Sequence, residues 1–180
     1  MRYETVKKLK KLKEKFNPKE LGQIFQDLLA IAFSKIGIPE ENIDVSNVEG
    51  VDIIIDNENF GKYAIEVKTT STDYINFGQK DLEGLKKYQN NGYKSYLAAF
   101  KLKDLDFAKW IFMSINNLPF KKSNLSVNSL FTSDDFKEEA KKLNEEFENL
   151  LNDYADEILK NGLKYLTDEI KRRGLKCSGG

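Results

Sequence analysis

The sequence predicts an α/β fold in which a mixed β-sheet is flanked by helices and followed by a C-terminal helical extension. Two observations support this prediction. Segments with the apolar spacing of helices alternate with β-branched runs that are typical of strands. The 180 residues are 40% apolar and include 12 Phe, 8 Tyr and one Trp, which is enough to bury the core of one domain.

The N-terminal segment is expected to form a short amphipathic helix with a cationic outer face. Residues 1–19 contain eight Lys and Arg residues against two Glu. Apolar residues recur among them at helical spacing, namely Val6, Leu9, Leu12 and Phe16. The basic face includes Lys7, Lys8, Lys11 and Lys15. It is interpreted either as a solvated surface or as an arm that contacts nucleic-acid phosphates.

A second helix is expected to begin after Asn17 and to continue to about Ile36. Asn17 is a suitable N-cap, Pro18 fits the first turn, and Glu20 occupies the place of a capping-box acid. Gly37 then ends the helix, because glycine commonly follows the last helical turn.

Two strands joined by a short turn follow. Residues 51–56 form a β-branched run, residues 57–61 supply turn residues, and residues 62–68 form a second run with strand character. A short loop that contains glycine between two such runs is typical of a β-hairpin.

This hairpin is expected to bring three charged side chains together. Antiparallel pairing around the turn sets residues whose numbers add up to about 118 opposite one another, so Asp52 faces Glu66. The period of two along a strand puts Glu66 and Lys68 on one face. Two facing carboxylates are costly unless a cation lies between them, and carboxylate oxygens are suitable ligands for Mg²⁺. The alternative is a structural ion pair between Glu66 and Lys68.

Such a site suits the hydrolysis of a phosphodiester without histidine. A metal ion polarises the phosphodiester, and the lysine positions or deprotonates the attacking water. The pattern Glu-x-Lys has little meaning by itself in so charged a chain, because it recurs at Glu139 and Glu169 in helical sequence. Only the copy at Glu66 follows a strand that carries an aspartate.

The next part of the chain is expected to complete the sheet. A third helix over residues 78–91, ended by Gly92, is followed by strands over residues 93–102 and 109–115. The order of elements to this point is αββαββ, which predicts an α/β sandwich with a mixed sheet.

The C-terminal part is expected to be a polar loop and then helix. The loop carries Lys121 and Lys122, and the helical sequence forms either one long helix or two that separate near Gly162. Its apolar side either covers the sheet or forms a dimer interface. The expected units are an α/β core with the basic N-terminal helix (1–132), a helical extension (133–174) and a tail (175–180).

Composition excludes several kinds of chemistry. The chain has no His and one Cys, Cys177, which excludes histidine catalysis, His- or Cys-based zinc sites and internal disulfides. No apolar run suits a membrane span and no secretory signal is evident, so a cytoplasmic protein is expected. The 29 basic and 29 acidic residues balance, so any nucleic-acid contact requires a local basic patch.

The three charged side chains lie in two stretches, Gly50-Val51-Asp52-Ile53-Ile54-Ile55 and Tyr63-Ala64-Ile65-Glu66-Val67-Lys68-Thr69-Thr70. These stretches resemble the core motif of the PD-(D/E)XK nuclease superfamily, which includes many restriction endonucleases and the archaeal Holliday-junction resolvases. The resemblance covers roughly residues 17–115 and implies a restriction-endonuclease-like core, αβββαβ. Its further strand would lie around Ile43-Asp44-Val45 or be split from the strand of Asp52. Val51 stands where the motif has Pro, a position that is not a ligand.

The resemblance also implies roles for the motif residues. Asp52, Glu66 and the Val67 carbonyl would bind Mg²⁺, with Mn²⁺ as an alternative ion. Lys68 would be the catalytic lysine.

Three residues outside the motif are further candidates. Glu20 lies where many members of the superfamily carry another acidic residue, although a capping role explains it equally well and Asp27 is a competitor. Gln79 begins the helix after the motif, where some members place a glutamine that supports the site.

The favoured function is that of a Mg²⁺-dependent DNA endonuclease. Restriction-type cleavage is preferred to junction resolution, because resolvases are usually compact and basic, whereas this chain is neutral and has a long helical extension. A homodimer is expected, since a duplex has two strands to cut. Phosphate contacts are expected from the N-terminal basic face and from Lys121 and Lys122. The alternatives are a nuclease that cuts RNA and a non-catalytic nucleic-acid-binding or assembly module with the same fold.

Overall fold

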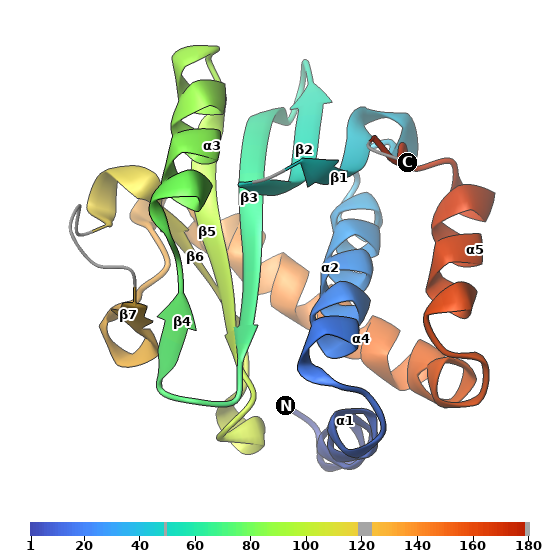
Figure 1. Cartoon of the computed structure of the whole chain (residues 1–180). Coiled ribbons are helices and arrows are strands. Elements are labelled where there is room, and N and C mark those ends of the chain that lie inside the picture. Colours follow the sequence, from blue (N-terminus) through green and yellow to red (C-terminus); the bar gives the residue numbers. More distant parts are fainter. Residues whose placement is uncertain (49, 119–123, 179–180) are drawn as a thin grey trace.

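A computed structural model describes residues 1–48, 50–118 and 124–178. Lys121 and Lys122 therefore lie outside the described residues. A mixed β-sheet separates two layers of helices (Figure 1). In their order across the sheet, its strands are β1 (Ile43–Val48), β2 (Val51–Asn57), β3 (Gly61–Thr70), β5 (Lys94–Lys101) and β6 (Trp110–Ser114).

The strand directions confirm the predicted fold class. β1, β2 and β3 are antiparallel in turn, β3 and β5 are parallel, and β6 is antiparallel to β5. A parallel pair requires a crossover connection, and α3 (Gln79–Asn90) lies within it. β1 is the further strand that was expected around Ile43-Asp44-Val45. The fold is thus an α/β, restriction-endonuclease-like core followed by C-terminal helices.

The register of the hairpin is the one predicted. Ile53 pairs with Ile65 and Asp56 pairs with Lys62, so the numbers of each pair add up to 118. The turn itself fixes this register: Asn57 Oδ1 accepts a hydrogen bond of 2.7 Å from the Phe60 amide, and Gly61 has a φ of 111°. A left-handed backbone of this kind favours glycine because it has no Cβ.

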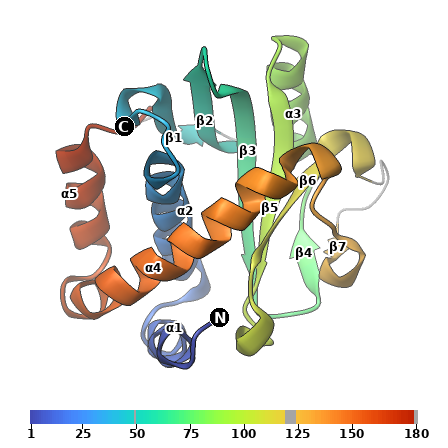
Figure 2. The same ribbon diagram turned by 180° about the vertical axis from the view of Figure 1, so that it is seen from behind.

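Helices cover both faces of the sheet. α3 covers one face. The other face is covered by α2 (Pro18–Lys35) and by α4 (Lys137–Asn161), which crosses it obliquely (Figures 1 and 2). α1 (Tyr3–Lys15) lies against α4, and α5 (Leu163–Arg173) lies beside α2. The buried side of α4 joins the main hydrophobic core through Ala140, Leu143, Phe147, Leu150, Leu151, Ala155 and Ile158.

The predicted helix ends are largely those observed. Asn17 and Glu20 form a reciprocal capping box, with both hydrogen bonds at 3.0 Å. The C-terminal helical region is divided in two at Gly162, where φ is 70°. That backbone conformation ends α4 and starts α5. The region therefore forms two helices rather than one long helix, which is one of the two arrangements expected. Within the described part of the chain, no helix is both long and apolar enough to cross a membrane.

Two short strands lie in segments that carry no strand signal in the sequence. β4 (Tyr74–Asn76) and β7 (Asn124–Ser126) pair antiparallel as a separate two-stranded sheet. Three residues are too few to show the alternation of apolar and polar positions that identifies a strand. β7 lies inside the segment that was expected to be a polar loop.

The residues that follow α5 run along the outer edge of β1. The Val45 amide donates to the Lys176 carbonyl at 2.8 Å, and the Lys176 amide donates to the Ile43 carbonyl at 2.9 Å. The segment that was expected to be a tail therefore pairs with an edge strand, and covering such an edge limits its pairing with other chains.

A charged network joins α4 to the end of α5. Glu169 is 8% exposed and accepts hydrogen bonds from Tyr154, Arg172 and Arg173, at distances of 2.7–2.9 Å. The hydrogen bond from Arg172, followed by those from Tyr154 and Arg173, lowers the pKa of Glu169 to about 2 in spite of its burial. The ionised carboxylate therefore stabilises the contact between the two helices.

Replacing Glu169 with glutamine is expected to lower the free energy of unfolding at pH 7 by about 1–3 kcal/mol, because charge-assisted hydrogen bonds are lost. The pKa is depressed in the folded state, so the contribution of Glu169 is complete above its ordinary pKa of 4.5 and declines as the pH falls towards 2. Urea unfolding at pH 7 and pH 3, followed by circular dichroism, should show a smaller difference at pH 3. Asp168→Asn, an exposed change one residue away, is the control. Equal stability of Glu169→Gln and wild type at pH 7 would contradict the prediction.

Candidate active site

The candidate site begins where the ladder between β2 and β3 ends. The last regular pair toward this end of the hairpin is Ile53 with Ile65, and Asp52 and Glu66 are the next residues on the two strands. Asp52 Oδ2 accepts a hydrogen bond of 2.7 Å from the Val67 amide. The Asp52 side chain thus takes over the role of a strand partner, which fixes its carboxylate beside Glu66.

These side chains lie on the face of the sheet that α3 covers. Ala64, two residues before Glu66, packs in the same apolar cluster as Leu82 and Leu85 of α3. Alternation along the strand places Glu66 and Lys68 on this face. The predicted arrangement of Asp52, Glu66 and Lys68 is therefore present in the structure.

Lys68 lies between two carboxylates. Its Nζ is 2.7 Å from Glu66 Oε1 and 3.3 Å from Asp81 Oδ1, and its side chain is 25% exposed. Burial disfavours the ammonium ion, but Glu66 and Asp81 outweigh this effect and raise the pKa of Lys68. The lysine therefore carries its positive charge at neutral pH.

The two facing carboxyl groups are held in a costly environment. Burial raises the pKa of Asp52 to about 6, against the opposing effects of the Val67 amide and Lys68. Burial and then the charge of Asp52 raise the pKa of Glu66 to about 8, with Lys68 acting in the opposite direction. Both shifts have the same meaning: the pair is unfavourable when both groups are ionised and no further positive charge is present.

The donor set fits a divalent cation. Among the described residues, Glu66 Oε2 is buried and has no hydrogen-bond donor. A buried carboxylate oxygen without a donor, next to a second carboxylate, suits Mg²⁺ or Mn²⁺. No group of three or more His, Cys, Asp or Glu side chains that could hold a metal occurs in the parts of the chain described here. Any such site therefore has two carboxylates, with further oxygen ligands from the main chain, water or substrate.

Glu20 and Gln79 have local roles in the structure. Glu20 closes the capping box of α2, and Gln79 Nε2 donates to Glu83 Oε1 at 2.9 Å on the exposed surface of α3. Within the described residues, neither makes a hydrogen bond or an ion pair with Asp52, Glu66 or Lys68. Their predicted catalytic roles remain predictions.

Asp27, the competitor of Glu20, is almost fully buried on α2. It is 3% exposed, and burial raises its pKa to about 7, against a hydrogen bond of 2.8 Å from Gln23. It makes no hydrogen bond with the candidate site in the described part of the protein. Burial raises the pKa of the Cys177 thiol, in the segment after α5, and the negative charges of Asp27 and of Asp44 on β1 add to this effect.

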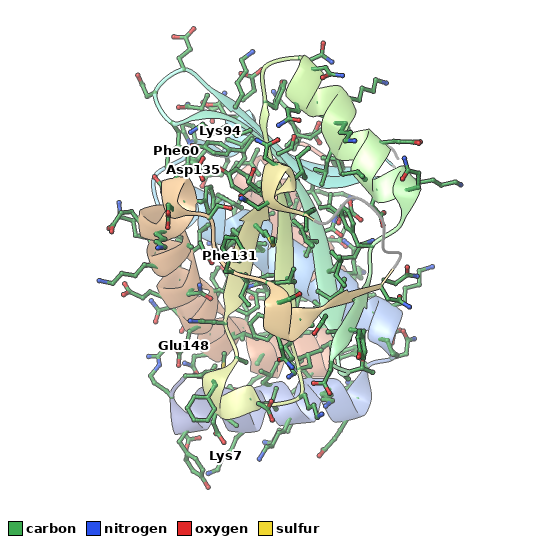
Figure 3. The ribbon with its side chains drawn as sticks, turned by 90° about the vertical axis from the view of Figure 1, so that its left-hand side faces the viewer. Lys7, Phe60, Lys94, Phe131, Asp135 and Glu148 are labelled. Atoms are coloured by element: carbon green, nitrogen blue, oxygen red, sulfur yellow. The ribbon has the colours of Figure 1, made fainter. Side chains whose placement is uncertain are left out.

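The N-terminal basic face divides into two groups. Lys8 donates to the Asn152 carbonyl at 2.6 Å and pairs with Asp156 at 2.9 Å, and Lys15 donates to the Leu159 carbonyl. These two lysines hold α1 on α4. Lys7 and Lys11 are exposed, and Lys7 lies at the opposite end of the molecule from Phe60 and Lys94 (Figure 3).

The structure adds two residues that the sequence does not single out. Asp81 reaches Lys68 from α3, and Gln26 Nε2 lies 3.4 Å from the Asp52 carbonyl. An acid three residues after Gly78 is a capping signal that marks Asp81, although it does not indicate the contact with Lys68. In the sequence, Gln26 is marked only as a polar residue next to the apolar positions of α2, and the structure buries it together with Asp27.

The strand order and the facing carboxylates define the class: a restriction-endonuclease-like fold that carries a PD-(D/E)XK-like motif. The sequence matches no family model and no curated protein. Among solved structures, the chain is similar to Hjc from Archaeoglobus fulgidus, a Holliday junction resolvase from an archaeal hyperthermophile. The two share 23% sequence identity over 43% of this chain, with a TM-score of 0.35. The match spans 63% of the resolvase chain, which is less than two thirds of its length.

Proposed function

We propose that this protein is a divalent-metal-dependent DNA endonuclease, with Mg²⁺ as the metal and Mn²⁺ as an alternative. The observation that supports this most strongly is the convergence of Asp52, Glu66 and Lys68 on one face of the sheet. Glu66 Oε2 is buried there without a donor. A structural ion pair explains Lys68 and Glu66 Oε1, but it leaves the buried Glu66 Oε2, next to a second carboxylate, without a partner.

Each residue has a defined task in this proposal. Asp52 and Glu66 would hold the metal. The Val67 amide donates a hydrogen bond to Asp52 and so fixes the orientation of its carboxylate. When bound, a divalent ion supplies Lewis-acid polarisation of the scissile phosphodiester. Lys68, held cationic between Glu66 and Asp81, positions the attacking water and stabilises negative charge that develops on the phosphate oxygens.

The preferred substrate is a branched DNA rather than a sequence-specific duplex site. The expectation of restriction-type cleavage relied partly on the long helical extension of the chain, which does not suit a compact resolvase. α4 and α5 instead share the hydrophobic core with the sheet, so they no longer favour that expectation. We therefore propose a four-way junction as the first substrate to test, because Hjc is named a Holliday junction resolvase. We propose a homodimer, one site for each cut strand, and phosphate contacts that include Lys7 and Lys11.

The test is cleavage of a panel of DNA substrates. With Mg²⁺, wild-type protein is expected to cut a labelled four-way junction faster than a linear duplex of the same sequence, and to cut neither in EDTA. Asp52→Asn should abolish cleavage. Asp56→Asn, on the same strand but exposed and paired with Lys62, should retain it. Supercoiled plasmid tests the restriction-type alternative.

Three outcomes would change the proposal. Faster cutting of a specific linear site would restore the restriction-type function, and faster cutting of matched RNA would replace DNA as the substrate. Binding of DNA without cleavage, together with no heat of binding for Mg²⁺ or Mn²⁺ in calorimetry, would leave the non-catalytic module.

A further inference from the structure

Lys68 is held by an acid from a different part of the fold. Glu66 belongs to the same strand as Lys68, but Asp81 belongs to α3 and lies 13 residues further along the chain. The Asp81 side chain is 18% exposed, and its Oδ1 is 3.3 Å from Lys68 Nζ. The lysine therefore has one partner inside the candidate metal pair and one partner outside it.

The second oxygen of Asp81 fixes the direction of its carboxylate. Gly78 is the N-cap residue of α3, and its amide donates a hydrogen bond of 2.8 Å to Asp81 Oδ2. An acid at the third position of a helix commonly satisfies this otherwise unpaired amide. One carboxylate thus caps the helix through Oδ2 and holds the ammonium ion through Oδ1.

The first turns of α3 are in turn packed tightly against the motif. Gly50, two residues before Asp52, has a φ of 86°. A Cβ on Gly50 would lie 2.9 Å from the Lys80 carbonyl oxygen and 2.9 Å from Gly84 Cα. Only glycine allows this approach, because both the backbone conformation and the space exclude a side chain. The distance between α3 and the start of β2 is therefore closely fixed.

Asp81 becomes important when Glu66 acts as a metal ligand. A cation bound through the free Oε2 of Glu66 would offset the negative charge of this carboxylate and repel the ammonium ion, which weakens the contact between Oε1 and Lys68. Lys68 then depends on another acceptor to remain beside the reacting phosphate. We propose that Asp81 is the positioning residue for Lys68: it holds the ammonium ion at the site while Glu66 serves the metal, and it does not bind the metal itself. This inference rests on the proposed function.

The sharpest variant is Asp81→Asn. An amide has a single acceptor oxygen, so if this oxygen keeps the hydrogen bond from the Gly78 amide, the NH₂ group faces the lysine and cannot accept from it. The helix cap is retained and the contact with Lys68 is lost. Asp168→Asn on α5 is the matched control for the loss of one negative charge.

The contact is measured first, in metal-free protein. The ¹⁵N–¹H signal of the Lys68 ammonium group, assigned by its absence in Lys68→Met, should shift or broaden in Asp81→Asn and stay unchanged in Asp168→Asn. An unchanged Lys68 signal in Asp81→Asn would overturn the inference. This measurement does not depend on nuclease activity, so its result stands even if the wild-type protein cuts no DNA.

Cleavage and metal binding then test the assigned role. Asp81→Asn should lower kcat about 10–100-fold with little change in KM for DNA, because misplacement of a catalytic group mainly affects the chemical step. It should cause no further loss in a Lys68→Met background. The affinity for Mn²⁺ in calorimetry should stay within about twofold of wild type. A further loss in the Lys68→Met background, or a large loss of Mn²⁺ affinity, would show that Asp81 acts in another way.

Discussion

Replacing Lys68 with methionine is expected to reduce the rate of DNA cleavage at saturating substrate by about 10²–10⁴-fold. Lys68 is the cationic side chain held against the facing carboxylates, at 2.7 Å from Glu66. Methionine keeps most of the length of the lysine side chain but cannot orient water or stabilise charge on phosphate. Single-turnover cleavage of a four-way junction in Mg²⁺ measures the effect.

Two controls separate catalysis from binding and folding. Lys62→Met alters a lysine on the same strand that pairs with Asp56 at the surface, and it should cleave like wild type. DNA binding by Lys68→Met in Ca²⁺, measured by fluorescence anisotropy, should remain within a few-fold of wild type. If Lys68→Met cuts DNA at close to the wild-type rate, the lysine is not part of the catalytic machinery.

Replacing Glu66 with glutamine is expected to make the metal-free protein more stable and to weaken Mn²⁺ binding by more than about tenfold. The folded state raises the pKa of Glu66 to about 8, so its carboxyl group destabilises the fold above its ordinary pKa of 4.5. Glutamine carries no charge and still offers an oxygen to Lys68. The gain at pH 8 should be about 1–3 kcal/mol, since one pKa unit corresponds to about 1.4 kcal/mol.

Urea unfolding at pH 5 and pH 8, with and without Mn²⁺, tests this expectation. The advantage of Glu66→Gln over wild type should be larger at pH 8 than at pH 5, and a given concentration of Mn²⁺ should stabilise the wild type more than the variant. Glu58→Gln, in the exposed hairpin turn, should behave like wild type. A Glu66→Gln protein that is less stable than wild type at pH 8 without metal would mean that the buried carboxylate is already compensated.

The sequence was a good guide to the hairpin because its signals are local. The β-branched run, the turn residues and Gly61 lie within a few residues of one another, and together they set the register that places Asp52 beside Glu66. The helix start at Asn17 has the same property, since a capping box involves residues three apart. Such features depend little on the rest of the fold.

The contacts that could not be predicted join distant elements. Asp81 meets Lys68 only because α3 docks on the hairpin through Gly50, and Lys8 meets Asp156 only because α1 docks on α4. The spacing of charges along a helix shows a polar face but not the element that this face meets. The sequence therefore identified the lysines of α1 without distinguishing those that hold α4 from those left exposed.

The single tryptophan, Trp110, is 1% exposed in the main hydrophobic core. Its indole ring packs against rings from three other elements and from its own strand, with centroids 5.1–6.5 Å apart: Phe25, Phe100, Phe112 and Phe147. The intrinsic fluorescence of Trp110 therefore measures whether α2 and α4 are packed on the sheet. Because the metal candidates lie on the opposite face, this fluorophore distinguishes loss of the core from a purely local change at the carboxylates.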